Sequence, residues 1–145
     1  MIIRRQCAAI LALLACSALR ADESRSGGSL IVHVSGLRSD RGEVRIGLYQ
    51  SADSFEKGAG HALGKLICQI MHRECEVNIP DLPFGTYALM VGHDVDGDGK
   101  ISWSPLSDEL KGVSNYDGKL WWPPSFSRAS FLLERDSQRV DVRVF

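Results

Sequence analysis

The side chains of this 145-residue chain that are best suited to chemistry lie in one short acidic segment that reads DVDGDGKI. Asp94, Asp96 and Asp98 stand at the first, third and fifth positions of an EF-hand-type calcium loop. Gly99 follows at the sixth position, where such a loop turns sharply, and the backbone carbonyl of Lys100 takes the seventh. Because calcium is a hard cation that binds six to eight oxygens, this spacing predicts a calcium site.

The second half of the loop departs from that pattern. Ser102 stands at the ninth position as a weak ligand, and Pro105 stands at the twelfth, where a bidentate glutamate belongs. Asp108 and Glu109 are the next carboxylates along the chain and could fold back toward the ion. The predicted affinity is therefore weak, with a dissociation constant of about 10⁻⁴ to 10⁻³ M. A calcium-free turn is the alternative interpretation, because Asp and Gly both tolerate the backbone angles of turns.

Three tryptophans, Trp103, Trp121 and Trp122, gather in the last third of the chain. Indole rings can stack on the faces of sugars, so one alternative function is a carbohydrate-binding module that uses exposed tryptophans. The competing interpretation places these rings in the core or under a covering loop, which is the commoner location of large aromatic side chains.

A hydrolase is the second alternative, with an acid/base pair drawn from Asp94, Asp98 and Asp108. Such a pair would need to stand about 5 to 9.5 Å apart in a cleft. The sequence contains no Gly-x-Ser-x-Gly elbow around a nucleophile and no His/Cys zinc pattern. We therefore expect a protein without catalytic residues, whose only cofactor is calcium.

The elements that must position the acidic segment are predicted by alternation of apolar and polar residues. This alternation indicates short strands with one buried face, and no long amphipathic helix interrupts them. Ser51 is expected to begin a single helical turn, and Phe126 is expected to join the next-to-last strand. The predicted strands cover residues 30–34, 43–49, 65–71, 75–79, 86–92, 130–133 and 139–144. The pattern predicts an all-β protein, an antiparallel β-sandwich of immunoglobulin-like or prealbumin-like type with about seven strands.

Two cysteines fall inside the predicted domain, Cys68 and Cys75. An even pair in an oxidising compartment indicates a disulfide. If the strands on either side form a hairpin with these cysteines opposite each other, Leu66 lies opposite Val77 on the same face. The sequence therefore predicts a disulfide-closed hairpin.

The first 21 residues have the three parts of a secretory signal: Arg4 and Arg5, then an apolar run, then small residues where a peptidase could cut. Leu-Leu-Ala-Cys ending at Cys16 resembles a lipobox, so cleavage there with a lipid anchor on Cys16 is an open alternative to a soluble product. We expect a signal peptide at 1–21, a short polar linker at 22–28 and one domain at 29–145.

The charge balance excludes some partners. With 17 Lys and Arg against 18 Asp and Glu, the net charge of -1 provides no basic surplus to neutralise phosphates, so nucleic acid is not an expected partner. The apolar run in the signal segment is shorter than the roughly 20 residues of a membrane-spanning helix, so no transmembrane helix is expected.

The order of several short motifs resembles a family of exported bacterial proteins with a domain of unknown function (DUF2141-like). The resemblance covers the whole predicted mature chain and rests on Gly36-Leu37, Gly42, Gly47-Leu48-Tyr49, the segment from Asp81 to Ala88, His93-Asp94, the segment from Asp96 to Lys100, Gly112-Val113-Ser114-Asn115 and Pro124-Ser125-Phe126. The Leu-Pro-x-Gly-Thr-Tyr turn is also similar to that of prealbumin-like and carboxypeptidase-regulatory-like sandwiches, which implies a fold and no activity. The family implies no substrate and no catalytic residue.

Together these patterns predict an exported, non-catalytic binding or accessory module of the bacterial envelope, with a weak calcium-stabilised loop. The expected partner is an envelope protein or a glycan. The expected location is the periplasm, the outer membrane or the outside of the cell.

Overall fold

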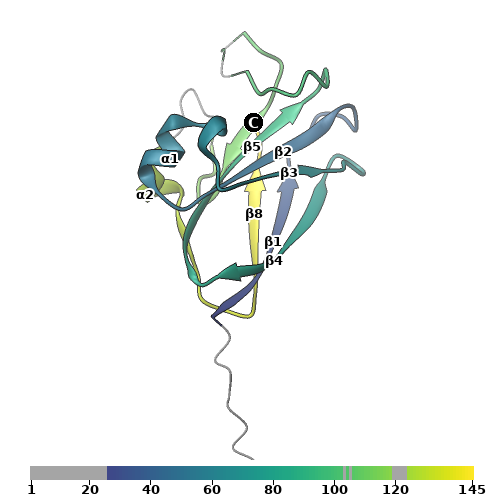
Figure 1. Cartoon of the computed structure of the whole chain (residues 1–145). Helices are drawn as coiled ribbons and strands as arrows, with labels where there is room; N and C mark the ends of the chain where they lie inside the picture. Colours follow the sequence, from purple (N-terminus) through teal and green to yellow (C-terminus); the bar gives the residue numbers. More distant parts are fainter. Residues whose placement is uncertain (1–25, 103, 105, 119–123) are drawn as a thin grey trace, which may run out of the picture.

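The computed structural model describes residues 26–102, 104, 106–118 and 124–145. Two β-sheets face each other, with two short helices on the outside of one of them (Figure 1). The described strands are β1 (Gly27–Ser35), β2 (Glu43–Tyr49), β3 (Gly64–Cys68), β4 (Cys75–Pro83), β5 (Gly85–Asp94), β6 (Lys111–Val113), β7 (Phe131–Leu133) and β8 (Ser137–Arg143). The helices are α1 (Ala52–Lys57), the 3₁₀ turn η1 (Ala59–His61) and α2 (Phe126–Ala129).

The smaller sheet has three strands in the order β4-β1-β8, and the larger has the order β3-β2-β5-β6, with β7 also paired to β5. All pairs are antiparallel except β1 with β8, which is parallel. The parallel pair arises because β7, the strand before β8, belongs to the other sheet, so no hairpin fixes the direction of β8. The predicted all-β sandwich is confirmed, with eight described strands instead of about seven.

The buried positions of β1 and β2 alternate, as the sequence predicts. Every second side chain of these strands therefore points between the sheets, where the core lies. Leu30, Val32 and Val34 of β1 face Ile46 and Leu48 of β2 across this space. The strand β5 is buried on both of its faces. A second apolar cluster covers the outer face of the larger sheet beneath the helices and consists of Tyr49, Phe55, Ala88, Val113 and Ala129.

The helix α1 begins where the sequence predicts a helical turn. The side chain of Ser51 accepts a hydrogen bond from the backbone N–H of Ser54 at 3.2 Å, which caps the helix. Phe55 on this helix is 1% exposed and packs edge-on against Tyr49, with ring centroids 5.2 Å apart. The assignment of Phe126 to a strand is wrong: it begins α2, because its ring packs against Phe55 at 5.9 Å between centroids.

The predicted disulfide between Cys68 and Cys75 is present, but the predicted hairpin around it is wrong. Cys68 ends β3 in the larger sheet, and Cys75 begins β4 in the smaller one. Leu66 therefore pairs with Ile46, while Val77 pairs with Val32. The disulfide ties one sheet to the other across the end of the sandwich.

Gly27 and Gly28, which the sequence places in the linker, lie in β1. The strands at 30–34 and 43–49 also lie in different sheets, so the segment between them crosses the sandwich.

The predicted signal at 1–21 and its lipobox at Cys16 fall outside the described residues. Among the residues that the structure describes, no helix is long and apolar enough to cross a membrane.

Candidate metal centre

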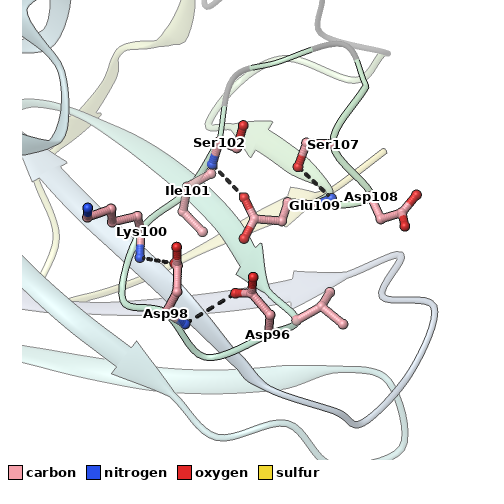
Figure 2. A pocket seen from close by; sticks show the side chains of 9 residues that line it. Asp96, Asp98, Lys100, Ile101, Ser102, Ser107, Asp108 and Glu109 are labelled. Carbon is pink, nitrogen blue, oxygen red and sulfur yellow. Dashed lines mark hydrogen bonds between the residues drawn. The ribbon is translucent and has the colours of Figure 1, made fainter.

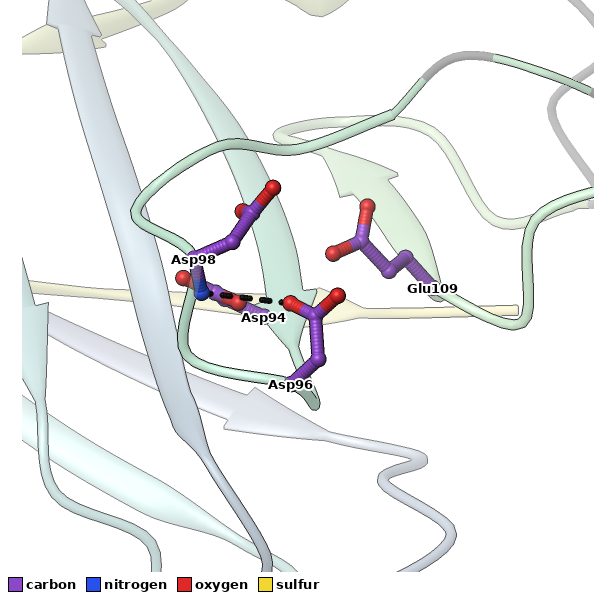
Figure 3. Close-up of side chains that lie close together, drawn as sticks. All are labelled: Asp94, Asp96, Asp98 and Glu109. Atoms are coloured by element: carbon purple, nitrogen blue, oxygen red, sulfur yellow. Dashed lines mark hydrogen bonds between the residues drawn. The ribbon is translucent and has the colours of Figure 1, made fainter.

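Four carboxylates meet in the segment that connects β5 to β6. Asp94 ends β5, Asp96 and Asp98 follow in the loop, and Glu109 returns from the far side shortly before β6 begins. One oxygen from each lies within 4.8 Å of the others. Figure 3 shows the four side chains pointing toward one another. Asp94 is fully buried, while Asp96 and Asp98 are exposed and Glu109 is half-buried. We call these four residues the acidic cluster.

Asp94 is the anchor of the loop. Its Oδ1 accepts a hydrogen bond from the backbone N–H of Gly97 at 2.8 Å, and its Oδ2 accepts one from Gly99 at 2.9 Å. Arg45 of β2 donates to the same Oδ2 through its Nε at 2.8 Å. Burial works to raise the pKa of Asp94, but the bonds from Arg45, Gly99 and Gly97 outweigh it, and the pKa lies below its ordinary value. Asp94 is therefore held as a carboxylate.

Arg45 also pairs with Glu43, its neighbour two residues away on β2. The guanidinium thus contacts two carboxylates, of which only Asp94 belongs to the acidic cluster. One positive charge beside four negative ones leaves the cluster with a strong net negative charge.

The short-range turns of the loop aim the carboxylates. The Oδ1 of Asp96 accepts the backbone N–H of Asp98 at 3.2 Å, and the Oδ1 of Asp98 accepts that of Lys100 at 2.8 Å (Figure 2). Gly97 and Gly99 have φ angles of 74° and 85°, which an L side chain adopts only with strain. The glycines therefore allow three carboxylates within five residues to converge.

Glu109 completes the acidic cluster from the other end of the connection. Its carboxylate accepts a hydrogen bond from the backbone N–H of Ser102, and its own N–H donates to the Oγ of Ser107 at 3.1 Å. In Figure 2 the side chain of Asp108 points away from the cluster, so of the two carboxylates that could fold back only Glu109 does so.

The spacing of the acidic cluster fits a calcium ion. Calcium–oxygen distances are about 2.3 to 2.6 Å, so two oxygens on opposite sides of one ion stand about 5 Å apart. Oxygens that lie within 4.8 Å of one another can therefore share a single ion. An open pocket of about 470 Å³ beside the cluster would leave such an ion open to solvent and to further water ligands.

The structure brings together three of the predicted ligands, Asp94, Asp96 and Asp98. Lys100 and Ser102 line the adjoining pocket, and their role as ligands stays a prediction. The Oγ of Ser102 accepts the backbone N–H of Ser104 at 3.2 Å. The predicted ligand set omits Glu109, because sequence spacing alone did not distinguish it from Asp108.

The three tryptophans proposed for sugar binding, Trp103, Trp121 and Trp122, lie outside the described residues.

His93, which precedes the acidic cluster, is 1% exposed, and its Nε2 makes a hydrogen bond of 2.7 Å with the carbonyl of Arg41. It lies on the opposite face of β5 from Asp94, because successive residues of a strand alternate.

Comparison with known proteins gives one family. No curated protein and no solved structure matches the chain. A family model described as "uncharacterized protein conserved in bacteria (DUF2141)" matches residues 32–141, a range that begins within β1, ends within β8 and includes the whole acidic cluster. The chain therefore belongs to this bacterial family, as the order of its motifs predicts.

Proposed function

We propose that this protein is an exported, non-catalytic binding or accessory module of the bacterial envelope, with a connection between β5 and β6 that calcium stabilises. The observation that carries the proposal is the convergence of Asp94, Asp96, Asp98 and Glu109 within 4.8 Å. Calcium would join the end of β5 to the residues just before β6, so that binding energy closes a 16-residue connection, residues 95–110.

The disulfide supports the proposed export. Disulfides persist in oxidising compartments such as the bacterial periplasm and are rare in the cytosol. The Cys68–Cys75 bond links the two sheets, so it contributes to the frame of the sandwich. A structural disulfide in this position fits a protein that works outside the cytoplasm.

The pKa of Asp94 favours calcium binding over hydrolysis. A general acid at neutral pH needs a carboxyl whose pKa is raised by its surroundings. The bonds from Arg45 and the loop backbone lower the pKa of Asp94 instead, and Asp108 points away from the cluster in Figure 2. Asp94 therefore does not suit the role of general acid, and we assign the acidic cluster to an ion.

The first experiment is calorimetry of the metal-free protein with calcium chloride, alongside a titration with magnesium chloride. We expect one calcium site with a dissociation constant of about 10⁻⁴ to 10⁻³ M and weaker magnesium binding, because magnesium demands a rigid octahedral site. Calcium at ten times the dissociation constant would raise the free energy of unfolding by about 1.4 kcal/mol. No heat in millimolar calcium, together with a melting temperature that EDTA does not change, would overturn the proposal.

A matched pair of variants tests which carboxylates bind. Glu109→Gln neutralises a member of the acidic cluster, and Asp108→Asn neutralises its neighbour outside the cluster. We expect Glu109→Gln to abolish measurable calcium binding and Asp108→Asn to leave it within about twofold of the parent protein. Equal effects of the two variants would indicate a diffuse charge effect and no specific site.

A further inference from the structure

A groove lies on the outer face of the larger sheet, beside the loop that carries the acidic cluster. It encloses about 520 Å³ between Ala59 of η1 and Ile101 of the loop. Strand alternation turns Val44, Ile46 and Leu48 into the core, so the residues between them face the groove. The helices α1 and α2 cover the side of the larger sheet that faces away from β1 (Figure 1). The strand residues between the core positions line the groove on this same side.

Two glycines on neighbouring strands leave part of the floor without side chains. Gly47 of β2 and Gly92 of β5 stand at diagonal positions, because Gly47 pairs with Met90 and Gly92 pairs with Arg45. A Cβ on Gly92 would come within 2.4 Å of Ile101, so the missing side chain also lets the loop rest on the sheet. The hollow between the loop and η1 is therefore a product of the register of β2 and β5.

The groove is apolar along its walls and positively charged around it. Ile67, Met90 and Ile101 line it, and Ile67 is 48% exposed. Lys65 lies beside Gly47 in the register of β3 and β2, and Lys100 reaches the groove from the loop. In Figure 2 the side chain of Lys100 points away from Glu109, toward the other side of the loop.

The two lysines are unpaired among the residues that the structure describes. Neither Lys65 nor Lys100 forms a salt bridge with a described carboxylate, whereas Arg45 is committed to Asp94 and Glu43. No described residue that lines the groove is acidic. An anion entering the groove therefore meets the ammonium groups of Lys65 and Lys100, while the guanidinium of Arg45 in the same lining offsets the charge of its partners Glu43 and Asp94.

A buried hydroxyl in the groove also lacks a partner. Tyr49 lines the groove, its side chain is 0% exposed, and its hydroxyl makes no hydrogen bond within the described part of the chain. This hydroxyl lies 3.0 Å from the position that a Cβ on Gly47 would take, so it sits against the floor next to Lys65. A buried donor without an acceptor is costly, and an anionic oxygen is the acceptor it lacks.

We propose that this groove binds a small organic carboxylate with an apolar body, such as a medium-chain or aryl acid. The apolar body lies against Ile67 and Ile101, and the carboxylate lies between Lys65 and Lys100 within reach of the Tyr49 hydroxyl. A volume of about 520 Å³ falls in the range of small-molecule sites. The site uses none of the acidic cluster, so it goes beyond the proposed calcium binding.

The test is a fluorescence titration of the full exported chain with 11-(dansylamino)undecanoic acid and, as a neutral control, its methyl ester. Both titrations are run in EDTA, so calcium plays no part in the result. We expect saturable 1:1 binding of the acid, with an affinity at least about fivefold above that of the ester. Equal binding of acid and ester, or no binding of either, would overturn the proposal and leave the calcium calorimetry unaffected.

Three variants localise the binding. We expect Lys65→Gln and Lys100→Gln each to weaken the acid about two- to fivefold while leaving the ester unchanged, because each removes one charge from an exposed pair. Tyr49→Phe is expected to weaken the acid alone as well. Lys57→Gln is the matched control, since Lys57 pairs with Asp53 on α1 and does not line the groove. An effect of Lys57→Gln equal to that of Lys65→Gln would contradict the assigned site.

Discussion

The outer faces of the two sheets differ in how completely their charged side chains are paired. On the smaller sheet, Arg139 bonds to Glu76 at 2.7 Å and to Asp141 at 3.1 Å. His33 lies 2.9 Å from Asp141, so these side chains form one continuous network across β4, β1 and β8. On the larger sheet Arg45 is paired with Glu43 and Asp94, but Lys65 of β3 and Lys100 of the adjoining loop lack partners among the described residues.

This difference separates a structural surface from a binding surface. A face whose charges satisfy each other is well solvated and gains little from a ligand. A face with apolar walls, unpaired cations and an orphan hydroxyl gains from an occupant that supplies the missing groups. The larger sheet is therefore where we place the ligand.

The largest expected effect comes from the disulfide, which should support both faces alike because it joins their sheets. The double variant Cys68→Ser/Cys75→Ser should lose about 2 to 3 kcal/mol of unfolding free energy in urea, as expected for a short closed loop. Hydrogen exchange should accelerate in β1 and β2 together. Faster exchange in one sheet only would mean that the disulfide stabilises that sheet and not the other.

A matched pair of Asp→Asn variants compares the faces directly. Asp94→Asn weakens charged hydrogen bonds to Arg45, Gly97 and Gly99 at a buried site, and should cost about 2 kcal/mol in calcium-free buffer. Asp141→Asn acts at a side chain that is 66% exposed, and should change stability too little to measure. Chemical denaturation of both variants checks this. A larger loss of stability for Asp141→Asn than for Asp94→Asn would contradict the greater contribution that we assign to Asp94.

Two buried tyrosines, Tyr49 and Tyr87, allow a test by the dependence of stability on pH. Burial raises the pKa of Tyr49, so the folded protein keeps this hydroxyl protonated above about pH 10, where the unfolded chain releases its proton. Stability therefore falls as the pH rises past that point, and Tyr49→Phe should reduce the fall. At neutral pH the same variant should gain about 1 kcal/mol, because it removes an unpaired buried hydroxyl.

Tyr87 is the control for Tyr49. Burial also raises its pKa, but its hydroxyl donates to the carbonyl of Pro83 at 2.7 Å and accepts from Gln50 at 3.1 Å. Tyr87→Phe should therefore lose about 1 kcal/mol at neutral pH, the opposite sign. Urea unfolding at pH 7 and at pH 10.5 distinguishes the two. If both variants lose stability at pH 7, the Tyr49 hydroxyl has a partner and the argument for an acceptor in the groove fails.

The smallest effect is expected on the paired face. Glu76→Gln breaks one exposed ion pair with Arg139, and should lower the melting temperature by about one degree or less in dilute buffer. The shift should vanish in 1 M salt, because screening acts over about 3 Å there. A loss of several degrees that persists in salt would show that the network on the smaller sheet is more than a solvated surface.

Alternation of apolar and polar residues predicts which face of a strand is buried, but it does not predict which strands pair. It predicts the buried positions of β1 and β2, because one side of each strand must contact the core. It cannot say which strand lies alongside, so β3 and β4 look like a hairpin although they belong to different sheets. The intervening turn, with His72 and Arg73 at positive φ, carries the chain from one sheet toward the other.

The acidic cluster was largely predictable and the groove was not. Ligand spacing identifies Asp94, Asp96 and Asp98 because they are local in the sequence. Glu109 joins them only through the path of the loop, which no short-range pattern encodes. The groove depends on Gly47 and Gly92 coming together across two strands, and that neighbourhood exists only in the folded register.

The position of β1 bears on when the protein can fold. It is the central strand of its sheet, and one of its two partners, β8, is the last strand of the chain. Long-range pairings of this kind form slowly, since distant segments must first meet. The three-stranded sheet can therefore close only after β8 has been synthesised, a late closure that would suit the export that we propose.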